Sequence, residues 1–117
     1  MKKHLFNHID KIKNDMFSMS DYIFDNPEIG YKEYKACKIL TEYLSKNNFR
    51  IEKIQGLETA FKAIYESKTE GPSIGLLCEY DALEDIGHAC GHHMQGPAII
   101  AAAVALKEIL KDYAFKL

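Results

Sequence analysis

Several features that would assign a protein to a class at once are missing from these 117 residues. Basic and acidic side chains nearly balance, 15 against 17, so the chain lacks the excess positive charge that nucleic-acid binding requires. It also lacks an apolar run of the roughly 18 residues that cross a bilayer. The longest such run, residues 97–106, is far shorter. We therefore expect neither a nucleic-acid partner nor a membrane segment.

Cysteine is scarce as well, because the sequence has only Cys37, Cys78 and Cys90. An odd number of cysteines without regular spacing does not support a disulfide framework. The residues after Met1 are mixed and charged, and they do not form the apolar core of a secretion signal. These observations favour a cytoplasmic location and Met1 as a natural start. Low-complexity tracts are also absent, which predicts one folded domain.

Apolar periodicity predicts the order of the secondary structure. Steps of three and four between apolar residues predict helices over residues 3–25, 31–48 and 97–111. Short apolar or alternating runs predict strands over residues 49–54, 60–65, 73–78 and the beginning of another over 113–117. The last helix is apolar nearly all round, so we expect it to be buried up to an exposed end that includes Lys107. This order predicts an α/β fold, with a mixed sheet and helices on both faces.

What the sequence does have is a dense cluster of metal-type ligands. His88, Cys90, His92 and His93 fall within six residues. Thiolate and imidazole are the ligands that zinc and similar divalent metals prefer. The cluster follows the carboxyl end of the expected strand 73–78, where open α/β sheets place their sites. We expect these residues to lie in a loop. Four ligands in one short loop seldom all reach one ion. We therefore favour a site in which two of these residues bind the ion together with ligands from elsewhere in the protein.

Upstream carboxylates could serve such a site. Asp81 could accept the second N–H of an imidazole ligand and so orient it, or it could be a turn or capping residue at a strand end; the sequence leaves both open. Glu79 is expected on a solvated loop. A Cys90 nucleophile with a histidine base is disfavoured, because such partners generally come from distant sequence. An ordinary His-rich surface loop is the remaining alternative.

Three stretches carry a resemblance to a known family. Residues 77–83 (LCEYDAL) and 86–92 (IGHACGH), preceded by residues 25–33 (DNPEIGYKE), resemble the dinuclear metal amidohydrolases of peptidase family M-20. The most similar branch contains aminoacylase-like proteins, aminobenzoyl-glutamate hydrolase and plant auxin-conjugate hydrolases. The stretches occur in the family's order and spacing.

The resemblance implies a fold, a reaction and a set of site residues. The fold would be part of a zinc-exopeptidase-like catalytic domain. The reaction would be hydrolysis of the amide bond of N-acyl amino acids or small peptides by metal-activated water. Two divalent ions, zinc, manganese or cobalt, would be the cofactors. Cys90 and His92 would be metal ligands, with Cys90 bridging the ions, and Asp81 would be the acidic catalytic residue that supports the metal site. His88 would have a structural or supporting role.

The sequence also departs from the family's pattern. Glu84 and Asp85 replace a frequent Pro-Gly, and His93 replaces Asp or Asn. Family members have several hundred residues, so we expect residues 1–117 to be the N-terminal part of the catalytic domain. The glutamate pair, later histidine ligands and lid or dimerisation domain would be absent.

This expected truncation has consequences for binding and assembly. The chain alone would bind metal weakly or not at all and would be inactive. We expect it to self-associate through an exposed strand edge, whereas full-length members of the family form homodimers. The alternative function is a stand-alone metal-binding or regulatory module in which His88, Cys90, His92 and His93 form a closed site.

Overall fold

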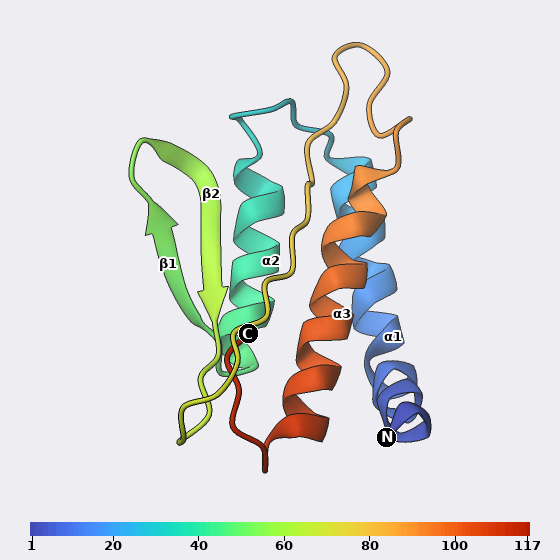
Figure 1. The fold of residues 1–117 in the computed structure, drawn as a ribbon. Helices are drawn as coiled ribbons and strands as arrows, with labels where there is room; N and C mark the ends of the chain where they lie inside the picture. The colour runs from blue at the N-terminus through green and yellow to red at the C-terminus, as the bar shows by residue number, and fades with distance from the viewer.

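The computed structural model describes residues 1–117 and confirms the α/β class (Figure 1). Three helices and one β-hairpin form along the chain: α1 (Lys2–Asp25), α2 (Tyr34–Lys46), β1 (Arg50–Ile54), β2 (Leu57–Ile64) and α3 (His92–Leu110). None of the helices is both long and apolar enough to cross a membrane.

The helices form the core, and the hairpin packs against one of them. In Figure 1, α1 and α3 run side by side, and α2 lies between that pair and the hairpin. Ile23, Leu40 and Val104, one from each helix, are the largest side chains that are fully buried. Gly96 allows α3 to approach α2 closely, because a Cβ there would lie 3.1 Å from a Leu40 methyl carbon. The predicted amphipathic helices therefore converge on one apolar core.

The sheet is smaller than the sequence predicts. β1 and β2 pair antiparallel around a turn in which Gly56 has φ of 82°. The other two expected strands are joined only by isolated bridges, in which Lys116 pairs antiparallel with Glu66 and parallel with Ser73. Residues 115–117 thus lie between the end of β2 and the start of the extended segment 73–81. The directions are mixed as predicted, but the ladder beyond residue 74 does not form.

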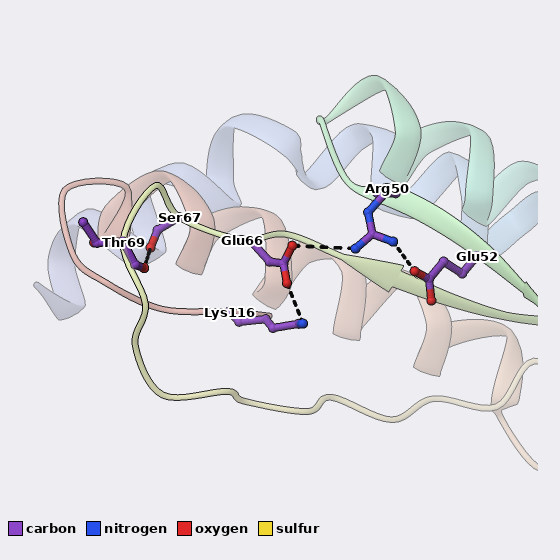
Figure 2. Close-up of polar contacts among 6 residues, drawn as sticks. All are labelled: Arg50, Glu52, Glu66, Ser67, Thr69 and Lys116. Atoms are coloured by element: carbon purple, nitrogen blue, oxygen red, sulfur yellow. Dashed lines mark hydrogen bonds and ion pairs between the residues drawn. The ribbon is translucent and has the colours of Figure 1, made fainter.

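Ionic and polar contacts hold the C-terminal residues in this position (Figure 2). The Glu66 carboxylate forms ion pairs with Lys116 and Arg50. Its pKa is held below the usual value, chiefly by the hydrogen bond from Lys116. The Ser67 hydroxyl donates to the Thr69 carbonyl oxygen. The Ser67 oxygen also accepts the Phe115 N–H at 3.0 Å, so this bond and the Lys116–Glu66 ion pair fasten the segment 115–117 beside the end of β2.

The third helix differs from the prediction at both ends. It begins at His92 rather than Pro97, so His92 and His93 lie in a helical turn and not in a loop. Pro97 is the sixth residue of the helix, where it has no N–H to donate to the His93 carbonyl oxygen. Near the other end, Lys107 is buried instead of exposed. Its ammonium donates to the Asn47 carbonyl oxygen at 2.6 Å.

The segment between α1 and α2 is fixed by one carboxylate. Both Glu28 carboxylate oxygens accept the backbone N–H of Lys35, at 2.8 and 3.0 Å, and one also accepts that of Ala36 at 3.0 Å. Helix N-termini leave such N–H groups without partners and attract negative charge. Glu28 therefore caps α2 from a position well before its first turn.

We predict that Glu28→Ala lowers the free energy of unfolding by about 1–2 kcal/mol, the range for losing a charged helix cap. Urea unfolding followed by circular dichroism measures the change. Glu42→Ala is the matched control, because Glu42 pairs only with Lys38 on the exposed face of the same helix. It should cost at most about 0.5 kcal/mol. Equal losses in the two variants would contradict the capping role.

Candidate metal site

The site is built around His92 in the first turn of α3. Gly91 precedes it with φ of 86°, a left-handed conformation that glycine adopts without strain, and this turns the chain into the helix. His92 Nδ1 lies 2.8 Å from Asp81 Oδ1. Because an ionised carboxylate only accepts, Nδ1 is the protonated nitrogen in this contact and donates a hydrogen bond to Asp81. The arrangement orients the ring so that Nε2 faces away from Asp81, as in imidazoles that bind metals.

A second carboxylate faces the other ring nitrogen. Glu79 Oε2 lies 3.2 Å from His92 Nε2. The backbone N–H of Glu79 donates to the side-chain amide oxygen of Gln95, one turn further along α3. The Glu79 side chain is 68% exposed and can rotate away from the ring. The sequence predicts only a solvated loop position for Glu79 and does not reveal this contact. No periodic pattern in the sequence indicates the contact between Glu79 and His92, since this contact depends on where α3 begins.

The backbone on either side of Asp81 is held by other parts of the fold. The Ala82 N–H donates to the Glu28 carbonyl oxygen at 2.7 Å, and Ile29 forms a parallel bridge with Ala82. On the other side, the Tyr80 hydroxyl donates to the Thr59 carbonyl oxygen of β2. Burial raises the pKa of Tyr80 well above its ordinary value, so this hydroxyl stays protonated. Asp81 is therefore positioned by contacts to both the α1–α2 segment and the hairpin.

The remaining residues of the cluster point to different surroundings. Cys90 is exposed, whereas His88 is only 5% exposed. The His88 and His93 rings lie 5.4 Å apart, and Phe24 of α1 packs edge-on against His93. Burial and the neighbouring His93 and His92 lower the pKa of His88, so it is neutral at pH 7. His88 is thus a packing residue beneath the site.

This arrangement bears on the alternatives. No group of three or more His, Cys, Asp or Glu side chains in the chain is arranged to hold a metal ion. The closed site of four ligands that a stand-alone module would need is therefore not formed. His92 directs its two ring nitrogens at carboxylates and not at Cys90, which does not favour a thiol nucleophile. Cys90 and His92 remain a donor set of suitable chemistry, but an incomplete one.

Comparisons with known proteins identify relatives over most of the chain. No family model matches it. The chain is 33% identical over 115 residues to a human Xaa-Arg dipeptidase, covering 88% of this chain and 26% of the relative. It is 32% identical to a p-aminobenzoyl-glutamate hydrolase chain of Escherichia coli, covering 81% of this chain and 23% of that protein. Thermostable carboxypeptidase 2 of Saccharolobus solfataricus is 29% identical over 84% of the chain.

The chain belongs to the M20 amidohydrolases. Its fold agrees, because a solved structure described as that of an aminohydrolase from methicillin-resistant Staphylococcus aureus superposes with a TM-score of 0.84 at 21% identity. That match covers 99% of this chain and 33% of the other. The chain spans about a quarter of the length of the human and E. coli relatives. The family predicted from residues 25–33 and 77–92 is confirmed.

We predict that His88→Leu makes this M20 chain more stable at pH 7, by about 1 kcal/mol, because both His88 ring nitrogens are buried and form no hydrogen bond of ordinary geometry, the Ile23 backbone being the one polar group that contacts the ring favourably. In the variant, the free energy of unfolding should also depend less on pH. Because the pKa of folded His88 lies below the ordinary 6.5 of the unfolded chain, the unfolded state takes up the proton first and stability falls as the pH drops below 6.5.

Urea unfolding at neutral and mildly acidic pH, with chelator present, measures both effects. The matched control is His4→Gln, since His4 is exposed on α1. It should leave the pH dependence unchanged. A His88→Leu variant that loses stability at both pH values would show that the contact of the ring with the Ile23 backbone is a stabilising hydrogen bond.

Proposed function

We propose that this chain supplies part of the metal centre of an amidohydrolase that cleaves the amide bond of N-acyl amino acids or dipeptides. The single observation that carries this proposal is the Asp81–His92 hydrogen bond in an M20 chain, with Cys90 just before His92. Cys90 and His92 are the metal ligands, and Asp81 holds His92 in the orientation that leaves Nε2 available. The activity itself requires ligands from further polypeptide.

The chemistry of the donors supports this assignment. A thiolate and an imidazole suit zinc and related divalent ions, and a carboxylate behind the imidazole is the usual means of fixing its tautomer. A divalent ion bound there would lower the pKa of a water molecule and polarise the substrate carbonyl. In the chain itself, Asp81 keeps the proton on His92 Nδ1. Glu79 must leave Nε2 before that nitrogen can act as a ligand.

The substrate class rests on what the relatives are named for. The similar proteins include an Xaa-Arg dipeptidase, a p-aminobenzoyl-glutamate hydrolase and N-acetylcysteine deacetylases. All these names describe amide bonds to an amino acid. We therefore propose a small acylated amino acid or dipeptide as substrate and propose that these 117 residues form the N-terminal part of the catalytic domain.

Cobalt(II) titration of the purified chain tests the metal assignment. We expect weak binding with a thiolate-to-cobalt charge-transfer band, because the thiolate of Cys90 is a ligand. Cys90→Ser should abolish the band and His92→Ala should abolish binding. Cys78→Ser is the matched control, since Cys78 is half-buried and its burial raises the pKa of the thiol. A band that survives Cys90→Ser would overturn the assignment.

Asp81→Asn tests the positioning role separately. We predict that it weakens cobalt affinity about tenfold while leaving the charge-transfer band in place, because a neutral amide orients the imidazole less well. Glu79→Gln is the matched control, since Glu79 contacts the same ring from its exposed side. That variant should bind cobalt at least as tightly as the wild type. A weaker affinity in Glu79→Gln than in Asp81→Asn would assign the supporting role to Glu79.

Hydrolysis assays on N-acetyl amino acids and on dipeptides ending in arginine complete the test. With the chain and zinc, manganese or cobalt alone, we expect no amino acid release above that of the free metal, because the coordination is incomplete. Turnover that disappears in Cys90→Ser would confirm the reaction and overturn the proposed inactivity of the chain.

A further inference from the structure

Helix α1 carries three exposed phenylalanines on one side. Phe6, Phe17 and Phe24 are 52%, 61% and 53% exposed. They are separated by close to three and close to two turns of an α-helix, so they lie along one line, here called the phenylalanine stripe. The side of α1 that is buried in the core is a different one, formed by Met16, Met19 and Ile23. In Figure 1, α1 lies at the edge of the fold that is remote from the hairpin.

The charges of α1 are separated along its length. Residues 2–13 contain four lysines and one aspartate, whereas residues 14–25 contain three aspartates and no basic residue. The first turn has no acidic residue, and the last turn has no basic one. This order opposes the helix macrodipole, which favours acidic side chains at the N-terminus and basic side chains at the C-terminus. The charge separation therefore does not stabilise the helix itself.

Contacts within the chain do not account for the charge separation either. The one ion pair of α1 joins Lys13 to Asp10 at 3.5 Å, between side chains that are both mostly exposed and both in the first half of the helix. Asp21 and Asp25 form no ion pair. A second helix with the same charge order would complement α1 if it ran antiparallel, because each basic half would then lie beside an acidic half.

We propose that the phenylalanine stripe binds the same stripe of a second copy of this chain, with the two α1 helices antiparallel about a twofold axis. An antiparallel pair centred at residue 15 places Phe6 opposite Phe24 of the second copy and Lys13 opposite its Phe17. An ammonium over an aromatic ring is an attractive contact. A parallel pair would instead bring lysines beside lysines and aspartates beside aspartates.

The size of the stripe determines how strongly two copies can associate. A buried phenylalanine covers roughly 200 Å², so three half-exposed rings offer roughly 300 Å² on each copy. Even with the neighbouring side chains, the interface is at the small end of the range for specific complexes. We therefore expect a reversible dimer with a dissociation constant in the micromolar range. The proposal concerns a surface outside the candidate metal site and does not depend on the proposed reaction.

Sedimentation velocity of the purified chain over a wide range of concentration tests the proposal. We expect a monomer–dimer equilibrium that Phe17→Ser weakens at least about tenfold, because each dimer contains this ring twice. Leu77→Ser is the matched control, since Leu77 is 91% exposed but lies outside α1. It should leave the equilibrium unchanged. A chain that stays monomeric, or a dimer that is lost in Leu77→Ser and survives Phe17→Ser, would overturn the proposal.

Charge variants test the antiparallel direction. The double change Lys2→Glu and Lys3→Glu should weaken the dimer about fivefold, because its acidic first turn then lies beside the aspartates of the second copy. The same change favours the helix itself, so circular dichroism should show no loss of helix. Asp21→Lys with Asp25→Lys should weaken the dimer similarly, and mixing the two variants should restore it. Unchanged affinity in both variants would contradict antiparallel pairing and overturn the proposal.

Discussion

Glu28 is the residue on which the arrangement of the site depends, because it is bound through both its side chain and its main chain. Its carboxylate caps the first turn of α2 at Lys35 and Ala36, and its carbonyl oxygen accepts the N–H of Ala82. Ala82 directly follows Asp81, which holds His92. The start of one helix and the orientation of the candidate metal ligand on another are thereby connected through a single residue in a short segment.

Much of this arrangement could be predicted because local patterns determine it. The helical periodicity of residues 3–25 gives α1 almost to its ends, and the cluster of His and Cys residues identifies the site without any knowledge of the fold. The sequence leaves the role of Asp81 open between orienting an imidazole ligand and serving as a turn or capping residue. The structure brings the Asp81 and His92 side chains together. The metal-ligand roles of Cys90 and His92 stay predictions.

The features that sequence reasoning missed depend on tertiary contacts. Proline usually opens a helix, so Pro97 predicts the start of α3, yet the helix extends back to His92. The sequence predicts an exposed Lys107, but its ammonium lies over the rings of Phe49 and Tyr65, which attract a cation. Residues 73–78 have the composition of a buried strand, but in the structure they pair with Lys116 only at Ser73 and Ile74. Composition predicts strand propensity and not the presence of a partner.

The two carboxylates that contact His92 differ in how firmly they are held. Asp81 lies 2.8 Å from Nδ1, and its neighbours Tyr80 and Ala82 bond to β2 and to the α1–α2 segment. Glu79 lies 3.2 Å from Nε2, but its side chain is 68% exposed, and its backbone N–H is held by Gln95. The fixed carboxylate therefore orients the ring, and the exposed one is the group that a metal ion would displace from Nε2.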